Sequence, residues 1–241
     1  MIVLASIIDS FTGAFDFIFH SREAVTGGGV PVGGPAYIWP FARTQLEVTA
    51  VALGGALAVG MPIGLILGHI GKGEFLAVGF GNAGRAVPEI AVIFLLASLI
   101  GIGLGNVAIA LGILGLPPVL TNTYVAMRQV DPTAVQAARG MGMRSWQVIL
   151  RVELPLAAPT IMAGVRTAAI NIFATATVAS FVGLSTLGDF VTQPAVYGND
   201  GVVAGAIVIA VLAGLIEAAL AGVQWLVTPR GLKLARASRS A

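Results

Sequence analysis

The stretch 131-DPTAVQAARGMGMRSWQVILRVELPLAAP-159 decides how the chain is organised, because it places charged residues between two long apolar runs. Asp131 followed by Pro132 pairs a favourable N-cap residue with proline at the first helical position, so a helix is predicted to begin there. Gly140 and Gly142 weaken helix propensity and predict a joint at the end of that helix. The segment is therefore expected to lie outside a bilayer that the flanking runs enter.

A second short helix is predicted from Ser145 to Glu153. Trp146, Ile149 and Leu150 have the i, i+3, i+4 spacing that places side chains on one face of a helix. Pro155 is expected to end this helix, because proline lacks the backbone N–H and disfavours helical geometry at the residue before it. The prediction for the segment is a helix, a glycine joint and a second helix at a membrane surface.

The composition indicates an integral membrane protein. Of 241 residues, 57% are hydrophobic and 10% are charged, whereas soluble domains carry about 25% charged residues. Cysteine is absent, and the two histidines, His20 and His69, are far apart and in no metal-ligand spacing. The chain contains no G-x-x-x-x-G-K-[ST] phosphate loop, so it is not expected to hydrolyse ATP itself, and no nucleophile–base pair suggests a membrane-embedded enzyme.

Five membrane spans are predicted from apolar runs of about 20 residues. They cover approximately residues 48–69, 86–104, 107–127, 158–184 and 202–227. Gly101 to Asn106 separates the second span from the third, and Gly60, Gly64 and Gly68 form a smooth stripe that favours close helix packing. The fold class is thus an all-α polytopic helical bundle.

The ends of the chain are predicted to form separate regions. Residues 1–19 are apolar, but Asp9 and Asp16 lie two helical turns apart, so an interfacial amphipathic helix is favoured over an extra span. The domain prediction is an N-terminal interfacial helix and loop at 1–45, a transmembrane domain at 46–229, and a basic cytoplasmic tail at 230–241.

The distribution of positive charge predicts the orientation. Five spans place one group of basic residues on one side of the membrane and only Arg22 and Arg43 on the other. The first group is Lys72, Arg85, Arg128, Arg139, Arg144, Arg151, Arg230, Lys233, Arg236 and Arg239. Since cytoplasmic loops carry the excess of Lys and Arg, segment 131–159 and the C-terminus are predicted to be cytoplasmic and the N-terminus outside.

Segment 131–159 resembles the EAA motif of ABC importer permeases. The resemblance rests on Gln136-Ala137-Ala138, then Gly142, then Val152-Glu153-Leu154-Pro155, with Gln136 and Val152 in place of the family's usual Glu and Ile. We therefore call 131–159 the coupling loop. The resemblance implies that it docks on a cytoplasmic ATPase through Gln136, Ala137, Ala138, Gly142, Trp146, Leu154 and Pro155.

The resemblance also implies the fold and the partners. The fold would be the type I ABC importer transmembrane fold in the plasma membrane. The partners would be two cytoplasmic ATPase subunits, a second copy or homologous permease, and an external substrate-binding protein, with no nucleic acid. ATP-Mg would bind the ATPase, and this chain would hold no cofactor or metal.

Within these permeases, the chain looks like the osmoprotectant subfamily. The similarity is carried by AARGMGM at 137–143, VELPLAAP at 152–159, AGVRTA at 163–168, ATATVASFVG at 174–183 and LGDF at 187–190. It implies import of glycine betaine, carnitine or choline, with an amino acid such as methionine as the alternative. Asp189 and Phe190 lie in the loop 185–200, which is predicted to face outward, and they are the expected contact with the binding protein.

Several polar and aromatic residues inside the spans are candidates for the solute pathway. Thr175 and Thr177 supply hydroxyl groups, and Phe173 and Phe181 supply rings that attract a methylated cation. The same threonines fit interhelical hydrogen bonds, and the same rings fit ordinary packing. Glu217 fits a carboxylate with a structural partner, or an ion or proton relay in an ATP-independent channel or secondary transporter.

Overall fold

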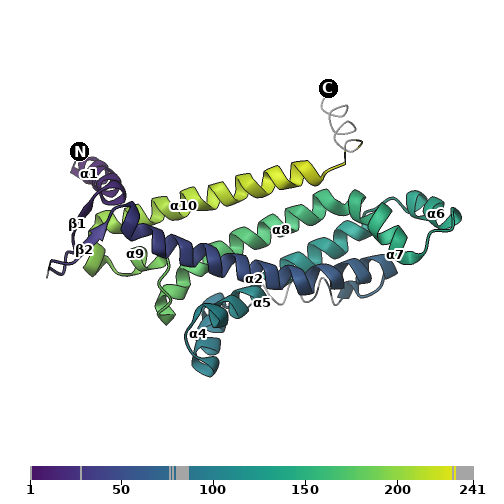
Figure 1. Cartoon of the computed structure of the whole chain (residues 1–241), viewed down its shortest axis with the longest axis horizontal. Coiled ribbons are helices and arrows are strands. Elements are labelled where there is room, and N and C mark those ends of the chain that lie inside the picture. The colour runs from purple at the N-terminus through teal and green to yellow at the C-terminus, as the bar shows by residue number, and fades with distance from the viewer. Residues whose placement is uncertain are drawn as a thin grey trace. The chain divides into compact units, whose positions relative to one another are not determined.

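A computed structural model of the chain describes residues 2–27, 29–75, 77, 79, 87–229 and 231, with side chains from Asp9 onward. Its elements are α1 (Ile2–Phe19), β1 (Ser21–Glu23), β2 (Pro31–Gly33), α2 (Pro35–Ile70), α4 (Glu89–Ile100), α5 (Leu104–Arg128), α6 (Pro132–Gly140), α7 (Ser145–Val148), the π-helical turn η1 (Ile149–Glu153), α8 (Leu154–Ala176), the 3-10 segment η2 (Thr177–Val182), α9 (Gly188–Thr192) and α10 (Pro194–Val227) (Figure 1). β1 and β2 pair antiparallel, with Arg22 opposite Val32. The predicted all-α class is confirmed.

Four helical segments in the described part of the chain are long and apolar enough to cross a bilayer. They are Pro35–Ile70, Leu104–Arg128, Ser145–Val182 and Pro194–Val227, and each contains most or all of a predicted span. The remaining predicted span, 86–104, contains the 12-residue helix α4, while Ala86 itself lies outside the described residues. A helix of that length rises about 18 Å, against a hydrocarbon core of about 30 Å.

The chain divides into two compact units, each built from several stretches of sequence. The first unit comprises Met1–Ala52, Glu89–Leu111 and Ile172–Leu215, and the second comprises Leu53–Pro88, Gly112–Asn171 and Ile216–Ala241.

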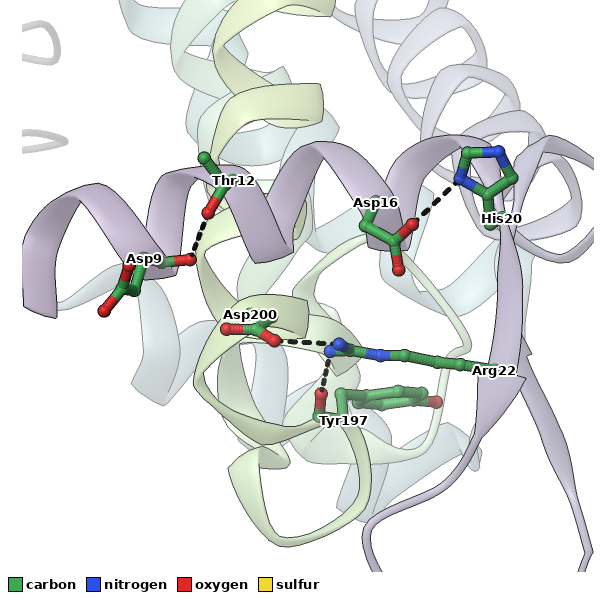
Figure 2. A network of polar contacts seen from close by, with 7 residues as sticks. All are labelled: Asp9, Thr12, Asp16, His20, Arg22, Tyr197 and Asp200. Carbon is green, nitrogen blue, oxygen red and sulfur yellow. Dashed lines mark hydrogen bonds and ion pairs between the residues drawn. The ribbon is translucent and has the colours of Figure 1, made fainter.

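In the first unit, the N-terminal segment packs on the start of α10. Arg22 of β1 donates from Nη1 to Asp200 at 2.8 Å and from Nη2 to the Tyr197 carbonyl at 3.3 Å (Figure 2). The backbone of α10 leaves helical geometry at Gly198, which has φ +69°, next to the Tyr197 carbonyl that accepts the hydrogen bond from Arg22. Phe17 is buried against the rings of Phe190 and Tyr197. Residues 1–45 therefore share a core with α9 and α10.

Helix α1 has the amphipathic character that its sequence predicts. Asp9 and Asp16 are exposed, and Asp16 pairs with His20 at 3.0 Å, whereas Ala14 and Phe17 are fully buried (Figure 2). Other rings of α1, including Phe11 and Phe15, are about half exposed.

In the second unit, α2 and α5 run parallel and in close contact. A Cβ built on Gly60, Gly64 or Gly68 would meet Val119, Thr123 and Met127 in turn, at 3.1, 2.7 and 2.5 Å. The predicted glycine stripe is thus a helix–helix contact that larger residues would force apart. Equal steps of four along both helices in the same direction mean that Ile70 and Arg128 lie at the same end of this unit.

Helix α8 runs antiparallel to α5, and α10 antiparallel to α8. Gly164 lies against Asn122, and Ala168 shares a buried cluster with Val119. Gln224 near the end of α10 donates to the Pro159 carbonyl near the start of α8 at 2.8 Å. The C-terminal ends of α2, α5 and α10 and the N-terminal end of α8 therefore share one end of the second unit, where α6 and α7 form the turn (Figure 1).

Candidate functional site

The coupling loop begins with the predicted helix cap. Asp131 Oδ1 accepts from the backbone N–H of Thr133 at 2.8 Å, and this hydrogen bond lowers the pKa of Asp131. Pro132 occupies the first turn of α6, which ends at Gly140. Gly142 follows with φ +82°, a left-handed conformation that favours glycine. The predicted helix and glycine joint are confirmed.

The predicted end of the second helix at Pro155 is wrong. The chain continues without a break from α7 through η1 into α8, so that Ser145–Val182 forms one helical segment of 38 residues. In the π-helical turn the Leu154 N–H donates to the Ile149 carbonyl, five residues earlier. Because this turn is wider than an α-helical turn, residue 155 does not have to donate an α-helical hydrogen bond. The missing N–H of Pro155 is therefore tolerated in the first turn of α8.

The inner face of the coupling loop packs on the second unit. Ala138 and Val148 are buried, and Ile149 and Leu154 contact a cluster that contains Met127 and other residues of α5 and α8. Pro155 is half-buried. Of the residues predicted to couple to an ATPase, Ala138 and Leu154 thus hold the loop to the helices.

The outer face of the coupling loop is apolar and basic. Met141 is 72% exposed, Trp146 54% and Leu150 53%. Trp146 and Leu150 share a face as predicted, but that face points away from the protein. The exposed polar and small residues around them are Gln136, Ala137, Arg139, Gly142, Arg144 and Arg151. Exposed large apolar side chains rimmed by charged residues are typical of a protein–protein contact site.

Sequence reasoning did not anticipate an ion pair between His69 and Glu153. His69 Nδ1 lies 2.6 Å from Glu153 Oε2, and the side chains are only 9% and 6% exposed. The pair joins the end of α2 to the last residue of η1. The sequence does contain one indication of this pair, because Glu153 is the only acidic residue between Asp131 and Asp189. A carboxylate in such an apolar region requires a polar partner if it is buried.

Glu217 also has a defined partner. It accepts from Arg166 of α8, and Arg166 donates in addition to Gln224 at 2.5 Å. Glu89, a further carboxylate beside the spans, accepts from Thr175 at 2.7 Å. These contacts favour the structural interpretation of Glu217, in which an intramembrane carboxylate is neutralised at a helix–helix contact.

The four pathway candidates of α8 and η2 fall into two groups. Phe173 is fully buried and Thr175 is 7% exposed, so both belong to the core of the first unit. Thr177 and Phe181 instead line an open cavity of about 630 Å³. The other lining residues are Ala174, Val178, Gly188, Val191, Thr192, Ala206, Ile209 and Ala210. None of these described lining residues carries a charged side chain.

Asp189 and Phe190 are buried rather than presented on a surface. Phe190 is 1% exposed and Asp189 9%. Burial raises the pKa of Asp189 to about 6, against the opposing effect of a hydrogen bond from the Thr186 backbone. In the connection between η2 and α10, which contains α9, the exposed residues are Gly183, Ser185, Val191, Gln193, Pro194 and Ala195.

Residues 60–229 match the sequence profile of the family described as binding-protein-dependent transport system inner membrane component. The chain belongs to this family. It is therefore a multi-pass membrane permease subunit, and the matched part contains the coupling loop, His69, Arg166 and Glu217.

Curated relatives of the permease are similar over most of its length. The carnitine transport permease protein OpuCB of Listeria monocytogenes is 36% identical over 192 residues, which cover 79% of this chain and 87% of that protein. The glycine betaine/carnitine/choline transport system permease protein OpuCB of Bacillus subtilis (strain 168) is 35% identical over 189 residues, 78% of this chain and 86% of that protein.

A solved structure has the fold of this permease at low sequence identity. A chain of the MetNI methionine ABC transporter, in an inward-facing conformation, superposes with a TM-score of 0.70 and 20% identity, covering 81% of this permease and 100% of that chain. This similarity confirms the predicted ABC importer permease fold.

Proposed function

We propose that this permease couples ATP hydrolysis on separate cytoplasmic ATPase subunits to import of a quaternary-ammonium osmoprotectant. The observation that carries the coupling proposal is the outer face of the coupling loop, where Met141, Trp146 and Leu150 are exposed among arginines. Water-exposed apolar side chains of this size are unfavourable unless a partner covers them. The inner face meanwhile holds the loop firmly to α5 and α8.

The orientation proposal rests on the parallel packing of α2 and α5. Since both helices end on the same side, the chain between Ile70 and Leu104 has to return across the membrane. Among the residues described in this stretch, the apolar helix α4 can contribute to that return. This supports five crossings. Lys72, Arg128 and the arginines of the coupling loop lie near the shared end, so we assign that end to the cytoplasm and the N-terminus to the outside.

We infer the remaining partners from the family. A full importer of this family would contain two ATPase subunits, a second permease copy or homologue, and an external binding protein, with ATP-Mg held by the ATPases. We assign the binding-protein contact to the connection that contains α9, where Ser185, Gln193 and Ala195 are exposed. Asp189 and Phe190, which are buried, would pack behind the exposed residues of that surface.

The substrate proposal rests on two observations, the solutes for which the relatives are named and the lining of the cavity in the first unit. Relatives at 35–36% identity are named for carnitine, glycine betaine and choline. The cavity offers the ring of Phe181 and the hydroxyl groups of Thr177 and Thr192, without a fixed charge. An aromatic face attracts a methylated ammonium group, and a neutral lining suits a solute that is zwitterionic overall. We place methionine second, because the methionine transporter shares only the fold at 20% identity.

An ATP-independent channel or secondary transporter is the competing function, and co-purification distinguishes it. The cognate ATPase subunit should remain bound after detergent extraction, and Trp146→Gln should weaken that binding. Trp39→Gln is the matched control, because Trp39 is 60% exposed on α2 and outside the coupling loop. Failure of the wild-type permease to retain an ATPase would contradict the proposal, as would equal retention by the two tryptophan variants and the wild type.

A further inference from the structure

The His69–Glu153 pair joins two long helical segments of the second unit. His69 is the penultimate residue of α2, a helix of 36 residues. Glu153 closes the π turn inside the helical segment Ser145–Val182, whose first residues belong to the outer face of the coupling loop. The 2.6 Å contact between His69 Nδ1 and Glu153 Oε2 is a hydrogen bond.

The C-terminal half of α2 offers no other polar side chain for a contact with the coupling loop, although Leu57, Met61 and Leu65 pack on the same apolar cluster as Ile149 and Leu154. From Ala50 to Ile70, His69 is the only residue whose side chain carries nitrogen or oxygen. The rest of this stretch packs on α5 through glycines and aliphatic side chains. Apolar contacts of this kind are not directional, whereas a hydrogen-bonded buried pair has one favourable geometry.

The π turn accounts for the position of Glu153. A π-helical turn adds one residue to a helical turn, which changes the direction of the side chains that follow relative to those that precede it. Here the turn separates Trp146, 54% exposed, from Glu153, which is 5% exposed and directed at α2. The same helical segment thus presents a surface to a partner and a buried carboxylate to α2.

We propose that His69 and Glu153 are positioning residues that transmit movement of the coupling loop to α2. This inference rests on the proposed function, in which an ATPase moves the loop. When the outer face of the loop is displaced, the pair makes α2 follow in a fixed register, so that ATPase closure and the rearrangement of the membrane helices occur together. Without the pair, only apolar contacts between described residues connect α2 to the coupling loop, and α2 follows the movement of the loop less closely.

The test is the amount of solute imported per ATP hydrolysed in proteoliposomes that contain the permease, its ATPase and its binding protein. This ratio does not depend on how much complex assembles. The decisive variant is His69→Leu/Glu153→Leu, since replacing a buried ion pair by apolar residues of similar volume leaves no unpaired charge and is often neutral for stability. The exposed His20–Asp16 pair, 3.0 Å apart, provides the control variant His20→Leu/Asp16→Leu.

We expect the His69→Leu/Glu153→Leu complex to assemble and hydrolyse ATP, with import per ATP reduced about tenfold, within the range typical of coupling between sites. The variant His69→Gln, which retains a donor for Glu153, should recover most of the ratio. A wild-type ratio in the apolar double variant would overturn the inference. If that variant fails to assemble, His69→Phe/Glu153→Met, a second pair without hydrogen-bonding groups, decides, and a wild-type ratio there overturns the inference equally.

The same measurements separate this inference from the function on which it rests. A wild-type complex that imports no solute on addition of ATP contradicts the proposed function and the inference together. A wild-type complex that imports normally, beside a double variant with an unchanged ratio, contradicts only the role of His69 and Glu153.

Discussion

Gly142, the joint between α6 and α7, is the position in the coupling loop where a substitution should act through the backbone alone. Its φ is +82°, and a Cβ added there would meet no atom within 4 Å. Gly142→Val therefore introduces no clash with a neighbouring residue. Its cost is that of holding a β-branched residue in a left-handed conformation, about 1–3 kcal/mol.

A cost of about 2 kcal/mol lowers the equilibrium constant for the correctly joined loop by about 30-fold, since each 1.4 kcal/mol is a factor of ten. Because the joint lies outside the candidate membrane helices of the described chain, the variant should insert and fold. We expect ATP-driven import in proteoliposomes to fall, by up to this factor, together with retention of the ATPase during purification.

Two variants control for the presence of a side chain. Gly142→Asn should retain much of the activity, because asparagine enters the left-handed region at lower cost. Gly140→Val should be nearly neutral, because Gly140 is absent from the positive-φ glycines of the described chain and a Cβ there also meets nothing within 4 Å. Wild-type import by Gly142→Val, or equal losses at positions 140 and 142, would refute the backbone argument.

Three further outcomes are expected. The melting temperature of the wild-type permease should fall as pH rises from about 4 to above 6, because burial raises the pKa of Asp189 from 3.8 to about 6 and favours its protonated form in the fold. Asp189→Asn should flatten this dependence on pH. An equally steep profile in the variant would contradict the prediction. A cysteine at Ser145, which is exposed, should resist an impermeant thiol reagent in intact cells, while one at Gln193 should react; labelling at Ser145 from outside would reverse the orientation. Arg166→Met should lower the melting temperature by leaving Glu217 without its partner, and Arg166→Met/Glu217→Leu should recover most of the loss. No recovery in the double variant would contradict the structural role.

The parts of the fold that the sequence predicts are those set by local chemistry. Charge-free apolar runs locate the membrane helices, and Asp131-Pro132 locates the start of α6, because capping depends on neighbouring residues only. The spacing of Gly60, Gly64 and Gly68 predicts a close helix contact, although only the structure identifies α5 as the partner.

The parts that the sequence does not predict depend on long-range contacts. Pro155 signals a helix end, but the π turn before it allows the helix to continue. In a membrane protein the lipid-facing and buried faces of a helix are both apolar, so periodicity could not distinguish buried Phe173 from exposed Phe181. The partners of Glu153 and Glu217 lie 84 and 51 positions away in the sequence, and no local pattern links them.

The most direct test of the proposed function is solute-dependent ATP hydrolysis by the permease reconstituted with its ATPase and its binding protein. We expect glycine betaine, carnitine or choline to stimulate hydrolysis and to accumulate inside proteoliposomes only when ATP is present on the side of the coupling loop. Stimulation by methionine but by none of these three would contradict the substrate. Accumulation that proceeds at the same rate without ATP would contradict the function as an ATP-driven importer.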